Sequence, residues 1–390
     1  LNMEVVNNLA ITGLMTTIKG AKPGPHIAVI GELDGLPVPG HPFSDKVTNA
    51  AHACGHHIQV GNMLATLFAL NSKEVLSNLS GSISFIAVPS EEYVEIEWRN
   101  EQRSKGEFEF LGGKQELVKL GIFDDIDISM MTHARGNFYG FGYGGTGNGL
   151  VAKFIEFHGK SSHAGGDPHL GINALNAANL SMANIHANRE TFFDDHHIRV
   201  HPIITHGGSV VNQVPEIVTL ETFVRGASLD AIKNANLKVD NCLRAGAMAV
   251  GAEVEINTLP GYFPLFHDSN LQEIYKKNLN YTKNKSEELG HGGGSTDMGD
   301  LAHLMPVIHP YVGGATDASA HTAGFIVEDY ELAVVEAGKM MAYTIIDLLY
   351  DEASTGKEVI SKHNPRLTKN EYLKTMREFS NVEIANYNIK

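Results

Sequence analysis

The segment His52-Ala53-Cys54-Gly55-His56-His57 places metal-binding chemistry in six consecutive residues. It holds one of the two cysteines of the chain beside three histidines. Thiolate and imidazole are the ligands that borderline-soft divalent metals prefer, and Cys54 and His56 are close enough to bind one ion or two adjacent ions. A buried cysteine beside surface histidines is the alternative. The metal hypothesis therefore requires further ligands elsewhere in the chain.

The composition favours a soluble enzyme of more than one domain. The chain has 390 residues, of which 43% are hydrophobic and 19% charged, and its net charge is -15. This charge argues against nucleic-acid binding, which needs clustered Lys and Arg. No apolar run has the length of a membrane span, and no secretory signal segment is apparent. Cys54 and Cys242 do not make a disulfide framework, so we expect a cytoplasmic protein that binds neither membrane nor nucleic acid.

Three short apolar runs in the first third of the chain predict strands that end in acidic residues or histidine. His26–Ile30 leads to Glu32 and Asp34, Ser82–Val88 leads to Glu91 and Glu92, and Ile126–Met131 leads to His133. A helical pattern with Val60, Met63, Leu64, Leu67 and Leu70 on one face lies between the first two runs. Alternating strands and helices predict a mostly parallel sheet, whose active site lies beyond the carboxyl ends of the strands. We therefore expect these polar residues to converge.

The middle of the chain predicts a second unit. Its predicted order is strand, helix, strand, strand, helix, strand: Val151–His158, Gly171–Asn188, Arg199–Thr205, Glu216–Arg225, Leu229–Ala249 and Glu253–Thr258. That order is the ferredoxin-like α+β motif. We predict an α/β catalytic domain of residues 1–148 and 260–390, interrupted by an inserted lid or dimerisation domain of residues 149–259. A long amphipathic helix, Asp329–Tyr350, closes the first domain.

Several motifs occur in one order along nearly the whole chain. They are Glu32–Pro37 (ELDGLP), His52–His56 (HACGH), Glu91-Glu92, His133, Gly159–Ala164 (GKSSHA), Gly207–Pro215 (GGSVVNQVP), Ser295–Asp297 (STD) and His321–Phe325 (HTAGF). This set resembles the co-catalytic metallopeptidase family of carboxypeptidase G and aminoacylase. It is most similar to the amidohydrolase branch, which includes aminobenzoyl-glutamate hydrolases and indole-acetyl-amino-acid hydrolases.

The resemblance implies a role for nine residues. Metal ligands match Cys54, His56, Glu92, His133 and His321, and the general base matches Glu91. His163 and Asn212 match polar groups that the lid offers to the substrate, and Arg225 matches a carboxylate-binding arginine. Asp34 is expected to orient neighbouring ligands without binding metal itself. One residue departs from the branch, which usually has Asp or Asn where this chain has His57.

The chemistry of these residues is consistent without the resemblance. One thiolate, three imidazoles and one carboxylate are too many ligands for a single catalytic zinc with an open position, and they suit two ions. Two divalent ions would lower the pKa of a water and polarise the scissile carbonyl. Glu91 would take the proton of that water and pass it to the leaving amine, while His163 would stabilise the oxyanion. Zinc, manganese and cobalt all remain open.

Two other functions compete with amide hydrolysis. The first is an inactive, metal-binding family member that senses or scaffolds, against which the intact Glu91 argues. The second is a dinucleotide-linked oxidoreductase, which depends on the GxGxxG pattern of residues 142–147. That pattern precedes a predicted strand rather than a helix, so its context is wrong.

The predicted substrate is a small N-acyl or N-aroyl amino acid or a dipeptide, whose leaving amino acid carries a free carboxylate for Arg225. A homodimer formed through the inserted domain is also predicted, because its sheet would otherwise have an open edge and because the resemblance implies one. In that dimer, His163 would reach the active site of the partner.

Overall fold

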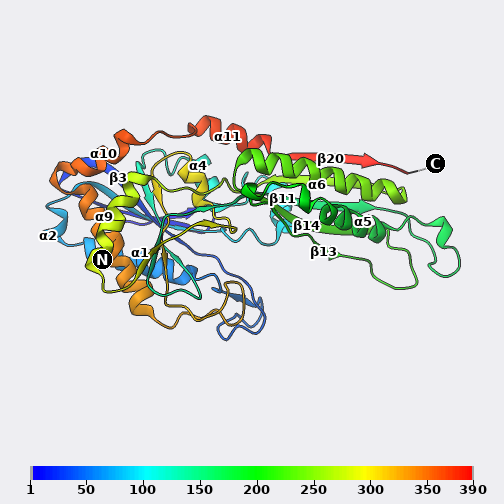
Figure 1. Ribbon diagram of the computed structural model, residues 1–390, viewed down its shortest axis with the longest axis horizontal. Coiled ribbons are helices and arrows are strands. Elements are labelled where there is room, and N and C mark those ends of the chain that lie inside the picture. The colour runs from blue at the N-terminus through cyan, green and yellow to red at the C-terminus, as the bar shows by residue number, and fades with distance from the viewer. Residues whose placement is uncertain (1–2, 389–390) are drawn as a thin grey trace.

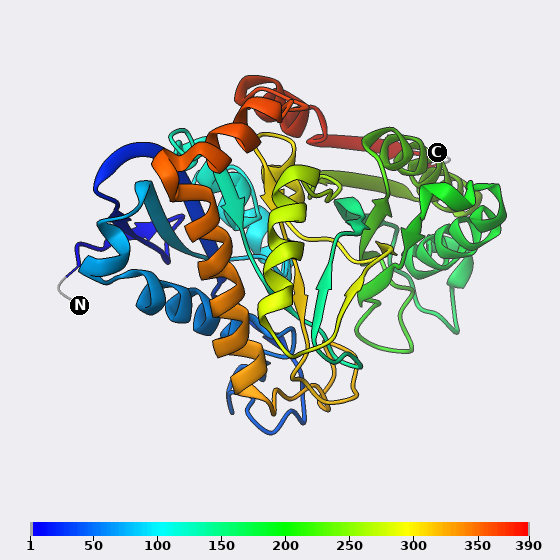
Figure 2. The same ribbon diagram turned by 60° about the vertical axis from the view of Figure 1, so that its left-hand side comes forward.

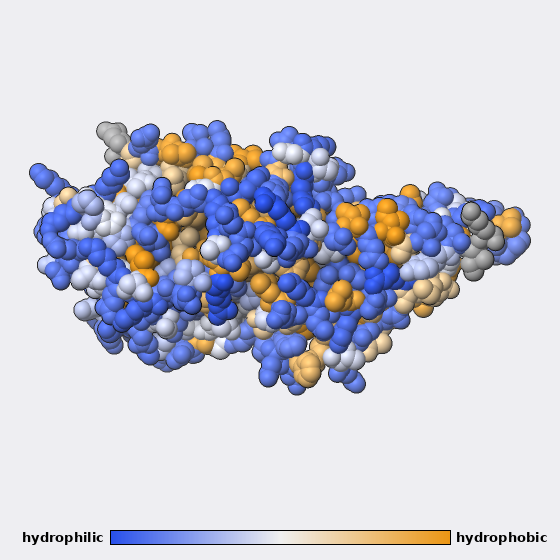
Figure 3. All heavy atoms as spheres, turned by 90° about the horizontal axis from the view of Figure 1, so that it is seen from above, coloured by the Kyte–Doolittle hydropathy of each residue, from blue (hydrophilic) through white to orange (hydrophobic). Residues whose placement is uncertain are grey.

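Two large β-sheets, lying end to end, form an elongated molecule in the computed structural model, which describes residues 3–388 (Figure 1). The first sheet and its helices make the broad end that contains the N-terminus, and the second sheet extends toward the end that contains the C-terminus. Seen from above, the molecule tapers toward the second sheet, and polar residues cover most of this face (Figure 3). None of the helices in the described residues has both the length and the apolar content to cross a membrane.

The first sheet has six strands in the order β1-β2-β6-β3-β7-β18. Its four strands from β6 to β18 are parallel, and β1 and β2 are antiparallel to their neighbours, which confirms the mostly parallel sheet. The strands are β1 (Val6–Leu9), β2 (Gly13–Lys19), β3 (Lys22–Glu32), β6 (Ser80–Val88), β7 (Ile128–Met130) and β18 (Val307–Ile308).

Both faces of this sheet are covered, because its central strands are apolar on both sides. Ile27 and Val29 of β3 belong to one hydrophobic core, whereas Ala28 and Ile30 belong to the other. The first core is covered by α1 (His56–Leu70), α7 (Ser269–Asn278), α9 (Ala337–Leu349) and α10 (Ser354–Lys362). The second is covered by α4 (Gly113–Leu120), α8 (Met298–Ala302) and α11 (Lys369–Glu378). Figure 2 shows α9 in orange beside α7 in yellow-green. The short helices α2 (Lys73–Leu76) and α3 (Ile96–Ser104) follow α1 and β6 in the chain.

The second sheet is antiparallel throughout and has the order β12-β14-β11-β15-β20, with β13 also paired to β14. Its strands are β11 (Gly149–His158), β12 (Arg199–Val200), β13 (Ile203–His206), β14 (Ile217–Gly226), β15 (Glu253–Pro260) and β20 (Asn381–Asn386). Helices α5 (Ala174–Ala187) and α6 (Leu229–Val250) pack together with it around a third core. The strands and helices of residues 149–260 have the predicted ferredoxin-like order.

The C-terminal strand differs from the prediction that residues 260–390 all belong with the first sheet. Strand β20 pairs with β15 over six residues and so extends the second sheet. Arg244 of α6 forms an ion pair with Glu383 of β20 at 2.6 Å, which fixes the strand from the side. The end of the chain therefore crosses from one part of the molecule to the other and covers an edge of the second sheet.

Three further predictions need correction in detail. The predicted strand Arg199–Thr205 is two short strands, β12 and β13, interrupted near Pro202, which lacks the N–H that a continuous ladder needs. The predicted helix Asp329–Tyr350 begins as a π-helical segment at Glu331–Glu336 before α9. Leu64 of α1 was expected in the apolar stripe, but it is 43% exposed.

Among the described residues, three smaller sheets accompany the two large ones. A four-stranded sheet has the order β16-β9-β19-β8, and two-stranded sheets pair β10 with β17 and β4 with β5. These strands are β4 (Leu36–Pro37), β5 (Ala50–Ala51), β8 (His133–Ala134), β9 (Phe141–Tyr143), β10 (Thr146–Gly147), β16 (Ser286–Glu288), β17 (His291–Gly292) and β19 (Tyr311–Val312). They frame the pocket that holds most of the predicted site residues.

Candidate metal centre and active-site pocket

The turn before α1 brings Cys54 against the end of strand β7. Gly55 occupies this turn with φ 91°, a left-handed conformation that favours glycine. A Cβ atom on Gly55 would lie 2.5 Å from the Cβ of Ala134, so only glycine allows this approach. The turn therefore sets the Cys54 thiol beside His133, which begins β8, and makes His56 the first residue of α1.

The five predicted ligands converge as two overlapping groups of donor atoms. Cys54, His56 and His133 form one group, and Cys54, Glu92 and His321 form the other, with the donor atoms of each group within 4.8 Å of one another. The Cys54 Sγ atom lies 3.6 Å from His133 Nε2 and 3.3 Å from His321 Nε2. His321 Nε2 lies 3.5 Å from Glu92 Oε2. Cys54 thus occupies the position common to both groups.

Glu91 and Glu92 follow β6 in a tightly turned segment. Ser90, Tyr93 and Glu95 all have positive φ, between 54° and 71°, which is costly for residues with side chains. The Tyr262 hydroxyl donates to the Glu91 carbonyl, and the Glu92 N–H donates to Asp34 Oδ2 at 2.8 Å. This geometry directs both carboxylates toward His56 Nε2, at 3.8 Å from Glu91 and 3.9 Å from Glu92.

Asp34 contacts the candidate ligand His56, as expected of a residue that orients it. Its Oδ1 lies 3.4 Å from His56 Nδ1, and its backbone carbonyl accepts from the same nitrogen at 2.9 Å. Burial disfavours ionisation of Asp34, but the hydrogen bond and charge of His56 outweigh it and lower the pKa to about 2. Asp34 is therefore a carboxylate at neutral pH that holds one edge of the imidazole, leaving Nε2 directed at the donor groups.

Burial also sets the protonation states that the candidate ligands and Glu91 have in the absence of metal. It raises the pKa of the Cys54 thiol to about 12 and lowers that of His133 to about 4. Burial and the nearby charge of Glu32 raise the pKa of Glu91 well above its ordinary value. The buried atoms His56 Nε2 and Glu92 Oε1 have no hydrogen-bond partner. A divalent cation would stabilise such unpartnered imidazole and carboxylate atoms beside a buried thiol, so the donor set fits bound metal.

A buried ion cluster beneath these donors was not predicted. Glu32, Lys114 and Asp297 all have side chains with 0% exposure. Lys114 Nζ lies 2.5 Å from Glu32 Oε1 and also bonds Asp297, and Glu32 Oε2 lies 3.1 Å from His56 Nε2. Glu32 and Asp297 occur in the sequence motifs, but no local signal distinguishes Lys114 from a surface lysine.

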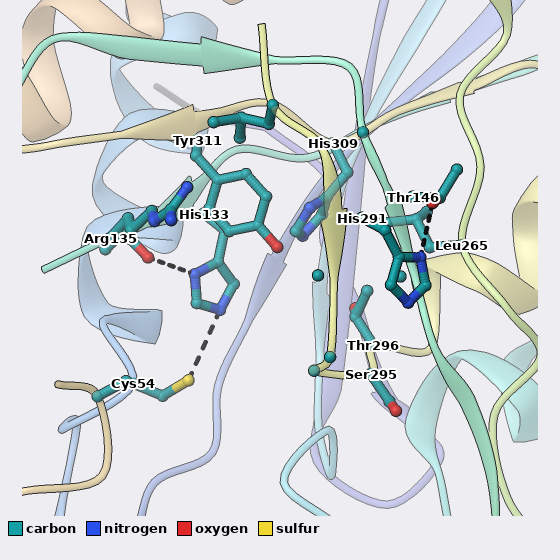
Figure 4. Close-up of a pocket in the computed structure, with 18 of the residues that line it drawn as sticks. Cys54, His133, Arg135, Thr146, Leu265, His291, Ser295, Thr296, His309 and Tyr311 are labelled. Carbon is teal, nitrogen blue, oxygen red and sulfur yellow. Dashed lines mark hydrogen bonds between the residues drawn. The ribbon is translucent and has the colours of Figure 1, made fainter. Parts of the chain in front are cut away.

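The pocket above the donors has a volume of about 1080 Å³. Cys54, Glu91, Glu92, His133 and His321 line one side of it. Arg225 of β14 lines another, packs over the ring of Phe223 at 5.1 Å and donates to the Ser295 hydroxyl at 2.8 Å. Figure 4 shows Cys54 and His133 facing each other, with Tyr311 and His309 beside them and Ser295 across the pocket. The donor groups and Arg225 thus line the same pocket.

Three residues from the sequence analysis do not line this pocket in their own chain: the predicted substrate contacts His163 and Asn212, and His57. His163 and Asn212 lie on neighbouring loops, where the Ala164 N–H donates to the Asn212 carbonyl. The His163 Nδ1 atom accepts from the backbone of Gly165 and Gly166 at 3.1 and 2.8 Å. Neither residue lines the pocket. His57 faces the Tyr330 hydroxyl, 3.5 Å from its Nε2, and belongs to neither donor group described above.

The GxGxxG pattern has no dinucleotide-binding geometry. Residues 142–147 run from the end of β9 into β10, and strand β11 follows directly. No helix N-terminus is therefore present at this turn to bind a pyrophosphate. The oxidoreductase alternative loses its structural basis.

Groups of Cys, His and Glu donors at the edge of a mostly parallel sheet, in a pocket that an arginine also lines, are typical of a metal-dependent hydrolase. The chain belongs to Peptidase family M20/M25/M40, whose model matches residues 28–346.

The chain is similar in sequence to curated relatives and similar in fold to solved structures. The chain is 27% identical over 338 residues to the Xaa-Arg dipeptidase of Mus musculus, covering 84% of this chain and 71% of the mouse protein. Its fold is similar to that of a Bacillus subtilis protein described as a dinuclear metal-binding peptidase from the M20 family, with TM-score 0.64, 20% identity and coverage of 89% and 88%. It is also similar to the aminobenzoyl-glutamate utilization protein from Klebsiella pneumoniae, with TM-score 0.61, 18% identity and coverage of 86% and 74%.

Proposed function

We propose that this chain cleaves the amide bond of an N-acyl or N-aroyl amino acid or a small dipeptide, using two divalent ions. The observation that carries the proposal is the pair of donor groups that share Cys54 next to Glu91 in a large pocket. Cys54, His56 and His133 would hold one ion, and Cys54, Glu92 and His321 the other. Zinc, manganese and cobalt each suit this mixture of thiolate, imidazole and carboxylate.

When bound, the ions supply charge that lowers the pKa of a water and polarises the scissile carbonyl. Glu91 would accept the proton of the attacking water and deliver it to the leaving amine. Its position supports this role, because Glu91 is buried beside the donor groups yet is a member of neither group that contains Cys54. The hydrogen-bonded turn around Glu91 would keep its carboxylate in place through both proton transfers.

Arg225 would bind the carboxylate of the leaving amino acid. Its guanidinium packs over the Phe223 ring and donates a hydrogen bond to the Ser295 hydroxyl, and the two contacts restrict its orientation. A planar guanidinium forms two parallel hydrogen bonds with a carboxylate. Arg225 lies on β14 of the second sheet, whereas the donors lie on α1, on β8 and in loops outside that sheet. A substrate bound by both would connect these two parts of the molecule and exclude water between them.

We further propose a homodimer in which His163 and Asn212 of one chain complete the active site of the other. Both residues lie outside the pocket of their own chain, next to Val211, which is fully exposed at 101%. Strand β20 covers one edge of the second sheet, whereas the short strands β12 and β13 form the other edge. Pairing there would protect that edge.

The two cysteines are buried free thiols, which suits a reducing cytoplasm.

The test is chelation followed by reconstitution. The protein is stripped of metal, reloaded separately with zinc, manganese or cobalt, and assayed on N-acetyl and N-benzoyl amino acids and on dipeptides that include Xaa-Arg. Hydrolysis should disappear on stripping and return with at least one metal. Hydrolysis that survives complete removal of metal would refute the proposal. Tight metal binding with no hydrolysis of any substrate would favour the inactive sensor instead.

A further inference from the structure

The four-stranded sheet beside the pocket arranges its side chains in two rows. Gly142 of β9 pairs with Glu287 of β16 on one side and with Tyr311 of β19 on the other, and Tyr311 pairs with His133. Paired residues on neighbouring strands project from the same face. His133 faces the pocket, so Glu287 faces it as well. The adjacent row, which contains Phe141, Val312 and Ala134, lies on the opposite face in the hydrophobic core.

Glu287 is an exposed carboxylate in the pocket wall without a cationic partner. None of the ion pairs among residues 3–388 involves it. Residues 144–147 and 287–294 form this wall of the pocket. The lysine and arginine residues that line the described pocket are Arg135 and Arg225, and both lie outside this wall. This wall therefore carries negative charge and contains no lysine or arginine.

Two imidazoles without hydrogen-bond partners line the same wall. His309 is 1% exposed, and neither of its ring nitrogens has a partner, which is also true of His267. The His309 ring lies 5.2 Å from the Tyr311 ring and 5.6 Å from the His133 ring, and Figure 4 shows it directed into the pocket between Tyr311 and His291. A neutral imidazole offers one lone pair to a donor. Unpartnered buried polar groups are costly, and a ligand that donates hydrogen bonds would satisfy them.

We propose that Glu287 and His309 form a specificity subsite for a cationic side chain, a guanidinium or an ammonium, on the leaving amino acid of the substrate. The inference rests on the proposed amide hydrolysis. Guanidinium and ammonium groups only donate hydrogen bonds, which matches a wall of carboxylate and imidazole acceptors. Glu287 lies two strand spacings from Tyr311 and three from His133, about 10 and 14 Å, so the side chain that reaches it must be long.

The test compares leaving amino acids at a fixed acyl group in the metal-loaded enzyme. N-acetyl-arginine and N-acetyl-lysine should be hydrolysed with higher kcat/KM than N-acetyl-glutamine and N-acetyl-methionine. In Glu287→Gln, the ratio of kcat/KM for arginine to that for glutamine should fall about fivefold, through KM, as for one partly exposed ion pair. Glu287→Lys should invert the preference toward N-acetyl-glutamate.

The matched control is Glu190→Gln. Glu190 is also an exposed carboxylate in no ion pair among residues 3–388, but it does not line the pocket. This variant should keep the arginine-to-glutamine ratio within about twofold of wild type, because its charge is screened by solvent. Equal losses for all substrates in Glu287→Gln, or equal effects of both variants, would overturn the subsite. Failure of every substrate, charged or neutral, in protein shown to contain metal would instead refute the proposed hydrolysis.

Discussion

Replacing Lys114 by methionine should destabilise the protein strongly. The Lys114 ammonium lies between the carboxylates of Glu32 and Asp297, and all three side chains have 0% exposure. Methionine would leave two carboxylates buried without their counter-charge. Removing one partner of a buried ion pair costs about 3–5 kcal/mol, and the similar volume of methionine offsets little of that. Such a loss is a large part of the 5–15 kcal/mol typical of a folded domain.

The assay is reversible urea unfolding of metal-free protein at neutral pH, with Lys119→Met as the control. Lys119 forms a part-exposed ion pair with Glu116 at 2.8 Å, and its loss should cost less than about 1 kcal/mol. Adding Asp297→Asn to Lys114→Met should restore part of the stability. A Lys114→Met loss no larger than that of Lys119→Met would refute the reasoning.

The difference in unfolding free energy between Lys114→Met and wild type should also depend on pH. Even with Lys114 present, burial raises the pKa of Asp297 to about 6. Without Lys114 the pKa should be higher still, above that of the unfolded chain. A carboxyl group whose pKa is raised in the folded state destabilises the fold when ionised and ceases to do so as pH falls through that pKa. The gap between Lys114→Met and wild type should therefore narrow toward acid, and a constant gap would contradict the charge argument.

The candidate metal and substrate residues give further measurable outcomes. Glu91→Gln should keep its metal content but lose about 10²–10⁴ in kcat, and near-normal turnover would place the base elsewhere. Cys54→Ser and His133→Ala should each lower the divalent metal found by elemental analysis; unchanged content would remove them from the ligand set. Metal uptake should release protons and tighten as pH rises, because burial raises the pKa of Cys54 to about 12 and the charge of Glu32 outweighs burial to raise that of His56. Calorimetry in buffers of different ionisation enthalpy measures that release, and pH-independent uptake would contradict it. Arg225→Ala should raise KM about tenfold or more for substrates with a free carboxylate but far less for their methyl amides, and equal losses would make Arg225 structural.

Local patterns predicted the adjacent strands β6, β3 and β7 of the first sheet and the convergence of the candidate ligands, but not β1, β2 or β18. The four residues after His26 in the run His26–Ile30 are all apolar, so both faces of this strand are apolar, as in a strand with helices above and below. The structure shows its neighbouring residues Ile27 and Ala28 in different cores. The carboxyl ends of parallel strands must meet at one edge, which is why Glu91, Glu92 and His133 could be placed together without knowledge of the loops.

Features that depend on remote partners could not be predicted in the same way. Lys114 is buried because two acidic residues far away in sequence surround it, and its own helix gives no sign of this. Leu64 fits an apolar stripe by period alone, but nothing packs over its outer side. Residues 381–386 alternate apolar and polar residues weakly, so their pairing with β15 was not apparent. A role for His163 in the active site of a second chain remains a prediction.

The pairing of β20 with β15 has a consequence for folding during synthesis. Residues 149–260 leave the ribosome long before residues 381–386, so the β15 edge of the second sheet stays open while the rest of the chain is made. An open strand edge is a site for wrong pairing with other chains. Completion of this sheet must therefore wait until residues 381–386 have been synthesised. Slow release or loss of the final strand should then lower the yield of soluble protein more than it changes the catalytic pocket.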